Sequence, residues 1–154
     1  SFACLSSAEL IGKAPSFTEA ESYNKNAIIL SNQENCEGAL VALDKAISLQ
    51  SLNAVNNKFT VLITAERYHE GYKYLESIID TPNMTVLGLY NLAILYYRAD
   101  FYPEYKVNKD VAKAYTLLLK AAKLPSDERE VGREDTIIKV AELISQLEQE
   151  GEYW

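Results

Sequence analysis

His69 is the only histidine of this 154-residue chain, so catalysis that pairs a nucleophile with a histidine base would depend on it. It stands in the polar run Glu66-Arg67-Tyr68-His69-Glu70, which we expect to form a turn between two helices. No histidine, cysteine and carboxylate residues have the spacing of a zinc site, and no glycine-rich loop precedes a helix to bind phosphate. We therefore expect no catalytic residue, no metal and no cofactor.

The tyrosines are a second group with chemistry to offer, since each ring brings contact area and each hydroxyl a polar tip. The chain has eleven tyrosines, and six of them lie between residues 90 and 115. Tyrosine and arginine are enriched at the hot spots of protein interfaces. This composition favours binding of another protein, although the positions of Tyr96 and Tyr115 in the pattern below assign these two to packing.

The elements that must position these side chains are helices, because small and bulky residues recur at helical spacing. In the first helix of three predicted repeats the small residue is Ala27, Thr60 or Ala93, and these positions are 33 residues apart. In the second helix a small residue precedes a leucine by four positions, as Ala39 precedes Leu43. The corresponding residues of the other repeats are Gly71 with Leu75 and Ala114 with Leu118. Small residues let two antiparallel helices approach closely.

This pattern resembles the tetratricopeptide repeat, in which each unit of about 34 residues is a helix pair. Pro82 and Pro125 close the second and third repeats, and Ser51 takes this place in the first. The third repeat looks like a Sel-one-like repeat, a tetratricopeptide relative with a longer loop between its helices. The residues that match its motif are Val107, Asp110, Lys113, Ala114, Lys120, Ala121 and Ala122. Asp110 is expected to be the N-cap of the helix that follows it.

The resemblance implies an all-α fold, a right-handed superhelix of about three antiparallel helix pairs with N- and C-terminal capping helices. We expect about eight helices in a single domain. Its parts are an N-terminal cap at 1–16, repeats at 17–51, 52–82 and 83–125, and an acidic capping helix and tail at 126–154. In this last part the predicted packing stripe is Ile137, Ile138, Ala141, Ile144 and Leu147.

In such a superhelix the first helix of each repeat lines the concave face, where a partner binds. Counting from the small packing residues gives partner-binding positions that are polar in the first repeat and tyrosine-rich in the third. These positions are Asn24, Ile28, Asn57, Val61, Tyr90, Ile94, Tyr97, Arg98, Tyr102 and Tyr105. Related domains that grip C-terminal carboxylates use a lysine and asparagine clamp, which is missing here because Ile28 and Val61 follow Asn24 and Asn57 by one turn.

The net charge of −7 is concentrated at one end of the chain. Residues 126–154 contain 9 acidic and 3 basic residues, and so carry six of the seven excess negative charges. A nucleic acid is not the expected partner, because it requires a basic surface. The acidic segment either suits a basic protein or is a solvated helix face. No stretch approaches the roughly 18 apolar residues of a membrane span, so we do not expect this chain to be an integral membrane protein.

Cys4 and Cys36 are the two cysteines of the chain, and one disulfide between them would tie the N-terminal segment to the first repeat. Disulfides persist outside the cytoplasm. Together with a chain that opens without methionine, this favours an exported, periplasmic protein whose signal peptide has been removed. Two free thiols in a cytoplasmic protein are the alternative.

These observations favour a non-catalytic protein-interaction domain. The more specific hypothesis is a dedicated inhibitor, such as an immunity protein that binds and neutralises a secreted toxin or effector. A general periplasmic assembly or signalling adaptor is the alternative. Some cysteine-rich relatives are linked to β-lactam binding or hydrolysis, which implies a third, remote interpretation. Those relatives carry a disulfide within each repeat, whereas this chain has two cysteines.

Overall fold

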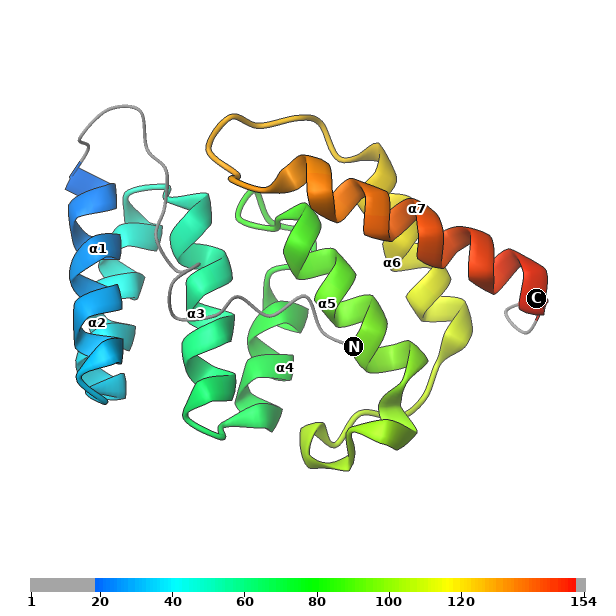
Figure 1. Ribbon diagram of the computed structural model, residues 1–154, viewed down its shortest axis with the longest axis horizontal. Helices are drawn as coiled ribbons and strands as arrows, with labels where there is room; N and C mark the ends of the chain where they lie inside the picture. The colour runs from blue at the N-terminus through cyan, green and yellow to red at the C-terminus, as the bar shows by residue number, and fades with distance from the viewer. Residues whose placement is uncertain (1–18, 152–154) are drawn as a thin grey trace. The chain divides into compact units, whose positions relative to one another are not determined.

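The computed structural model describes residues 19–151, and its regular elements there are seven α-helices and two short 3-10 helices, with no strand among them (Figure 1). The predicted all-α class is confirmed for this part of the chain. The described residues divide into two compact units. The N-terminal unit contains residues 19–67 and 127–131, and the C-terminal unit contains residues 68–126 and 132–151.

The N-terminal unit is built from α1 (Glu19–Asn32), α2 (Cys36–Ser48) and α3 (Leu52–Thr64). Helix α2 packs against both α1 and α3. Short polar side chains start two of these helices: the side chain of Asn35 accepts a hydrogen bond from Gly38 N, and the Ser51 hydroxyl accepts one from Ala54 N at 3.1 Å. Such caps satisfy backbone N–H groups that have no partner within the helix.

The segment from Asp127 to Val131 completes the N-terminal unit, although it follows α6 in the sequence. The Arg129 guanidinium donates to the backbone oxygen of Gln50 at 3.2 Å, and Val131 N donates to Asn53 Oδ1 at 3.2 Å. Arg129 also bonds to Asp127, and these hydrogen bonds lower the pKa of that carboxyl group. The segment is therefore held by specific bonds to the end of α2 and the start of α3.

The C-terminal unit is built from α4 (Tyr68–Ser77), α5 (Val86–Tyr97), α6 (Val111–Lys123) and α7 (Arg133–Glu150). Helix α5 packs against the other three, and α7 also runs alongside α6 (Figure 1). All residues of α5 are buried, as expected for a helix that is apolar on every side. The loop between α5 and α6 contains the 3-10 helices η2 (Ala99–Phe101) and η3 (Pro103–Tyr105), and η3 packs against α4.

The small residues that set the sequence pattern lie in the interior, as predicted. Each of the six is buried, as is the leucine that follows it in the second helix of each predicted repeat. The predicted N-cap is also confirmed, because the Asp110 carboxylate accepts a hydrogen bond from Lys113 N at 2.9 Å. The buried residues of the pattern are Ala27, Ala39, Leu43, Thr60, Gly71, Leu75, Ala93, Ala114 and Leu118.

The predicted packing stripe of α7 is wrong, except at Leu147. Ile138 is 57% exposed, Ala141 is also exposed, and Ile137 and Ile144 are only half-buried. Two apolar stripes at helical spacing overlap in this sequence, and packing against α5 and α6 selects the other one. The residues that α7 buries are Thr136, Val140, Leu143 and Leu147.

Each predicted repeat range contains two α-helices, and their organisation as repeats stays a prediction. The range 17–51 contains the packed neighbours α1 and α2, and the range 83–125 contains α5 and α6. The two helices in 52–82 fall in different units, α3 in the N-terminal and α4 in the C-terminal one. The turn expected at His69 is also misplaced, because α4 begins one residue earlier, at Tyr68. The predicted N-terminal cap at 1–16 lies outside the described residues.

Between residues 19 and 151, none of the helices combines the length and the apolar character that crossing a bilayer requires.

Candidate functional site

The four predicted partner-binding residues of the N-terminal unit are buried. Ile28 and Val61 lie in the apolar core. Asn57 of α3 donates from Nδ2 to Asn24 Oδ1 of α1 at 2.8 Å, and Asn24 Nδ2 lies 3.4 Å from Glu21 Oε2. The structure thus brings Asn24 and Asn57 together, but it directs them into the contact between α1 and α3.

This buried network continues to the start of α3. The Ser51 hydroxyl donates to Glu21 Oε1 at 2.9 Å while it also accepts the capping bond of α3. Buried polar groups are costly unless they are hydrogen-bonded, and a satisfied network fixes one arrangement of the helices that supply it. Glu21, Asn24, Ser51 and Asn57 are therefore suited to set the register of α1 against α3.

The six predicted residues of the C-terminal unit divide into two groups. Tyr90, Ile94, Tyr97 and Tyr105 are buried, whereas Arg98 and Tyr102 are half-buried. Burial raises the pKa of Tyr90, and the charge of nearby Glu142 raises it further. This phenol therefore stays protonated and cannot act as a base.

Five tyrosines meet around η3, and we call them the tyrosine cluster: Tyr68, Tyr72, Tyr96, Tyr102 and Tyr105. The ring centroids of Tyr68 and Tyr105 are 5.1 Å apart, those of Tyr102 and Tyr105 are 6.2 Å apart, and those of Tyr72 and Tyr96 are 5.9 Å apart. The Tyr72–Tyr96 and Tyr102–Tyr105 pairs are edge-to-face, an arrangement that aromatic rings favour.

His69 anchors this cluster to the loop between α5 and α6. Its Nδ1 lies 2.8 Å from the backbone oxygen of Tyr105, and its ring centroid is 5.8 Å from that of Tyr72. The residue itself is exposed. Its geometry therefore gives it a role in holding the loop against α4.

Glu76 is the acceptor at the centre of the tyrosine cluster's polar contacts. Its Oε1 lies 3.3 Å from the Tyr72 hydroxyl and 3.1 Å from Lys113 Nζ, and it also accepts a hydrogen bond from the Tyr96 hydroxyl. Lys113 Nζ lies 4.7 Å from the Tyr96 ring centroid. Burial raises the pKa of Tyr72, followed by the charge of Glu76, so its phenol is a donor. These groups satisfy one another and leave no activated nucleophile.

Tyr68, Tyr72 and Glu76 are residues that the sequence analysis missed. They recur every four positions on α4 and therefore share one face of it. The expectation of a turn at His69 hid this spacing. With α4 beginning at Tyr68, the four-residue spacing of Tyr68, Tyr72 and Glu76 indicates from the sequence alone that they share a helix face.

Arg98 lies close to two aromatic rings at the end of α5, and we call this group of three residues the arginine sandwich: Tyr97, Arg98 and Phe101. Arg98 Cζ is 4.9 Å from the Tyr97 ring centroid and 5.6 Å from that of Phe101. The Phe101 side chain is 66% exposed. Among the described residues, no hydrogen bond or ion pair engages the Arg98 guanidinium. The sequence analysis identified Arg98 but not Phe101.

The Tyr97 hydroxyl attaches this group to α7. It lies 2.8 Å from Glu150 Oε1 and 2.9 Å from Oε2, and it accepts a hydrogen bond from Gln146 Nε2 at 3.0 Å. Burial raises the pKa of Tyr97, and its hydrogen bond to Glu150 raises it further. The same bond, followed by that from Gln146, lowers the pKa of Glu150. Both pKa shifts fit a hydrogen bond from a neutral Tyr97 phenol to an ionised Glu150 carboxylate.

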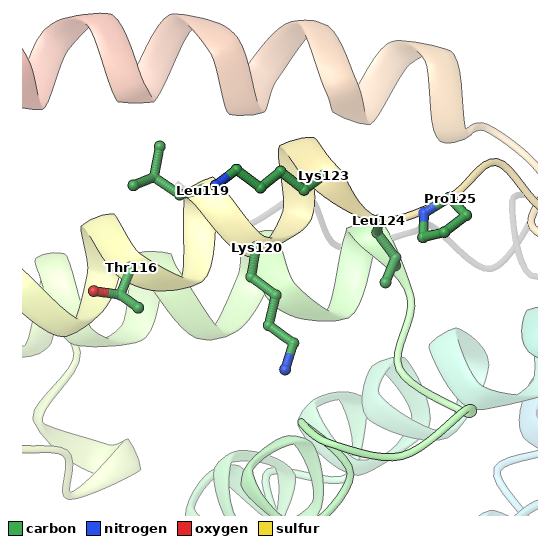
Figure 2. A pocket seen from close by; sticks show the side chains of 6 residues that line it. All are labelled: Thr116, Leu119, Lys120, Lys123, Leu124 and Pro125. Carbon is green, nitrogen blue, oxygen red and sulfur yellow. The ribbon is translucent and has the colours of Figure 1, made fainter.

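A shallow pocket of about 470 Å³ lies on the outer side of α6 (Figure 2). Figure 2 shows the ammonium groups of Lys120 and Lys123 pointing in different directions, so they do not converge on one ligand atom. Lys120 Nζ is paired with Asp80 Oδ1 at 2.6 Å. The pocket therefore offers no set of convergent groups. Its lining residues are Thr116, Leu119, Lys120, Lys123, Leu124 and Pro125.

Metal ligands and the two cysteines are the remaining candidate groups. No three or more His, Cys, Asp or Glu side chains in the described part of the chain are grouped so that they could hold a metal ion. Cys36 is half-buried at the start of α2 and forms no disulfide within residues 19–151. Cys4 lies outside the described residues, so its bond to Cys36 stays a prediction.

No protein-family model matches the chain, and no match was found among curated proteins or among solved structures. The tetratricopeptide and Sel-one-like resemblance therefore stays a prediction that rests on the residue pattern.

Proposed function

We propose that this chain is a non-catalytic protein-interaction domain whose contact surface is centred on the arginine sandwich of the C-terminal unit. The observation that carries this proposal is an exposed Phe101 beside a guanidinium that has no ion-pair partner among the described residues. Arginine and aromatic residues supply much of the binding energy at protein interfaces.

The backbone around the arginine sandwich is fixed, which supports a binding role. Helix η2 follows α5 directly, and Phe101 N donates to the Arg98 oxygen at 2.9 Å. Further along the loop, Asp110 N donates to the Tyr96 oxygen at 3.1 Å. A surface that is already ordered loses little conformational entropy when a partner binds.

We propose that tyrosines of the tyrosine cluster extend this surface. Tyr102 follows Phe101 in the chain and is half-buried, as are Tyr68 and Tyr72. Tyrosines suit such a border because they combine contact area with a polar hydroxyl. The proposal therefore places the contact surface at the end of α5 and in the loop after it. The other predicted binding residues are buried within their own units. They are Tyr90, Ile94, Tyr97 and Tyr105 in the C-terminal unit and Asn24, Ile28, Asn57 and Val61 in the N-terminal unit.

Within this class we favour a dedicated inhibitor of the immunity-protein kind, which binds and neutralises a secreted toxin or effector. Such a protein would be exported, and the disulfide between Cys4 and Cys36 belongs to the same proposal. The adaptor alternative differs in its binding behaviour, since an adaptor binds several partners more weakly. The mass of the intact chain with and without reductant tests the disulfide, because reduction adds two hydrogens.

Affinity capture from the envelope and secreted fractions of the source organism tests the function, with the full chain as bait. We expect one stoichiometric partner that survives high salt. Arg98→Ala and Phe101→Ala should each weaken the complex by about 30-fold, equivalent to about 2 kcal/mol. Val41→Ala is the matched control, because Val41 is 71% exposed on α2 of the other unit and should leave the affinity unchanged.

Weak capture of several different proteins would favour the adaptor. A partner whose affinity is insensitive to both Arg98→Ala and Phe101→Ala would refute this contact surface. Turnover of a substrate that is abolished by His69→Ala would refute the non-catalytic assignment.

A further inference from the structure

We propose that the Arg98 guanidinium receives the side-chain carboxylate of an aspartate or glutamate in the partner, and that Phe101 packs against an apolar side chain next to it. This inference rests on the proposed function, because it names the chemistry that the same surface recognises. It goes further by assigning the ligand group, its charge and the atoms that bind it.

The donors for such a contact are present and unused. A guanidinium carries five N–H donors and stays charged at any physiological pH. Arg98 is half-buried, and within residues 19–151 its side chain makes no hydrogen bond and no ion pair. A carboxylate that meets it edge-on can accept two parallel N–H bonds, which are stronger than bonds between neutral groups.

The contacts of Arg98 with two aromatic rings are of the cation–π kind. Its Cζ lies 4.9 Å and 5.6 Å from the ring centroids of Tyr97 and Phe101. Since no hydrogen bond or ion pair engages the guanidinium among the described residues, its N–H donors are available to a ligand.

Two carboxylates in this part of the unit have hydrogen-bond or ion-pair partners other than Arg98. Hydrogen bonds from Tyr97 and Gln146 lower the pKa of Glu150, and the charge of Arg98 lowers it further. The Glu150 oxygens face the Tyr97 hydroxyl at 2.8 Å and 2.9 Å, and Oε1 also faces Gln146 Nε2 at 3.2 Å. Asp100 Oδ2 lies 3.9 Å from Lys109 Nζ. Among residues 19–151 no carboxylate pairs with the Arg98 guanidinium, and we assign this carboxylate to the partner.

The same two acids argue for a carboxylate over a phosphate. A phosphate group carries close to two negative charges at neutral pH, and Glu150 and Asp100 would repel it more strongly than they repel a single carboxylate. Phe101 adds an apolar surface that an isolated anion would not use. The fitting ligand is a protein segment with an acidic residue next to an aromatic or aliphatic one.

Titration of the full chain with short blocked peptides, followed by NMR, tests this assignment. The probe is acetyl-Gly-Glu-Phe-Gly-amide, and its neutral counterpart has glutamine in place of glutamate. Both peptides lack a free C-terminus, so the side chain is the only carboxylate. The Arg98 Nε–Hε resonance, assigned by its loss in Arg98→Gln, reports the contact directly.

We expect the glutamate peptide to shift this resonance and to bind about tenfold more tightly than the glutamine peptide, since a hydrogen bond to a charged group is lost. Arg98→Gln should bind the two peptides equally. Lys123→Gln is the matched control, because it removes an exposed cation of α6 in the same unit and should preserve the preference.

Equal binding of the two peptides to the wild-type chain would overturn the inference. So would the absence of any shift at millimolar peptide, or tighter binding of a phosphoserine peptide than of the glutamate peptide. These failures are distinguishable from failure of the proposed function. If a captured partner still depends on Phe101 while the peptides show no preference, the function stands and the carboxylate assignment falls.

Discussion

The Tyr97 hydroxyl, at the last residue of α5, lies 2.8 Å and 2.9 Å from the two carboxylate oxygens of Glu150, the last residue of α7. This contact joins the ends of two helices that are 53 positions apart in the sequence. It also orients the ring on which Arg98 is stacked. The end of α7 and the arginine sandwich are therefore coupled through one phenol.

Tyr97→Phe should loosen the last turn of α7 and leave the rest of the C-terminal unit intact. The substitution removes the hydroxyl that bonds to Glu150 and Gln146 but keeps the ring in its buried position. We expect amide hydrogens near Glu150 to exchange severalfold faster, with protection in α5 unchanged. Hydrogen exchange followed by mass spectrometry measures this, and equal exchange in both proteins would contradict it.

The contribution of Glu150 should depend on pH. Its pKa is lowered from the ordinary value of 4.5, first by the bond from Tyr97 and next by that from Gln146. A carboxylate whose pKa falls on folding stabilises the protein above its unfolded pKa, and this stabilisation is lost as the pH falls through the folded pKa. The urea midpoints of wild type and Glu150→Gln should therefore converge as the pH drops below about 4.5. Parallel midpoint curves across this range would contradict the assignment.

Asn57→Ala should reduce the free energy of unfolding by about 2 kcal/mol, because it removes a buried donor and leaves Asn24 Oδ1 without this bond. Asn26→Ala is the control, since Asn26 is an exposed residue of the same helix as Asn24. Urea unfolding monitored by circular dichroism compares the two variants. A smaller loss for Asn57→Ala than for Asn26→Ala would show that the network does not stabilise the fold.

Asp110→Ala should cost about 1 kcal/mol of stability through loss of the N-cap of α6. Asp110→Asn keeps an acceptor oxygen at the same position and should retain most of the stability. The difference between the two variants, measured by urea unfolding, separates capping from a general effect of charge removal.

Local rules explain which parts of this fold were predictable. The N-cap at Asp110 depends on residues within three positions of each other, and the buried small residues follow from spacing along single helices. The burial of Tyr90 and Tyr97 was missed because counting from a repeat pattern assigned them to an open face. The apolar composition of α5 carried the opposite signal, since a helix that is apolar all round must be covered.

Other features depended on tertiary contacts. Two overlapping stripes of α7 contain apolar residues, and the contact with α5 and α6 buries the one that includes Thr136. In the candidate site, Arg98 and Tyr102 were identified from the sequence, but Phe101 was not. Phe101 remains exposed because η2 follows α5 directly, and this turn could not be inferred from residue spacing.

The segment at residues 127–131 has a consequence for the order in which the chain can be completed during synthesis. It belongs to the N-terminal unit, yet it leaves the ribosome after α6, and α7 of the C-terminal unit leaves later still. The last segment of the N-terminal unit is therefore synthesised only after most of the C-terminal unit has left the ribosome. A chain truncated after residue 126 would lack part of both units, so a single cut in the gene cannot separate them into two whole pieces.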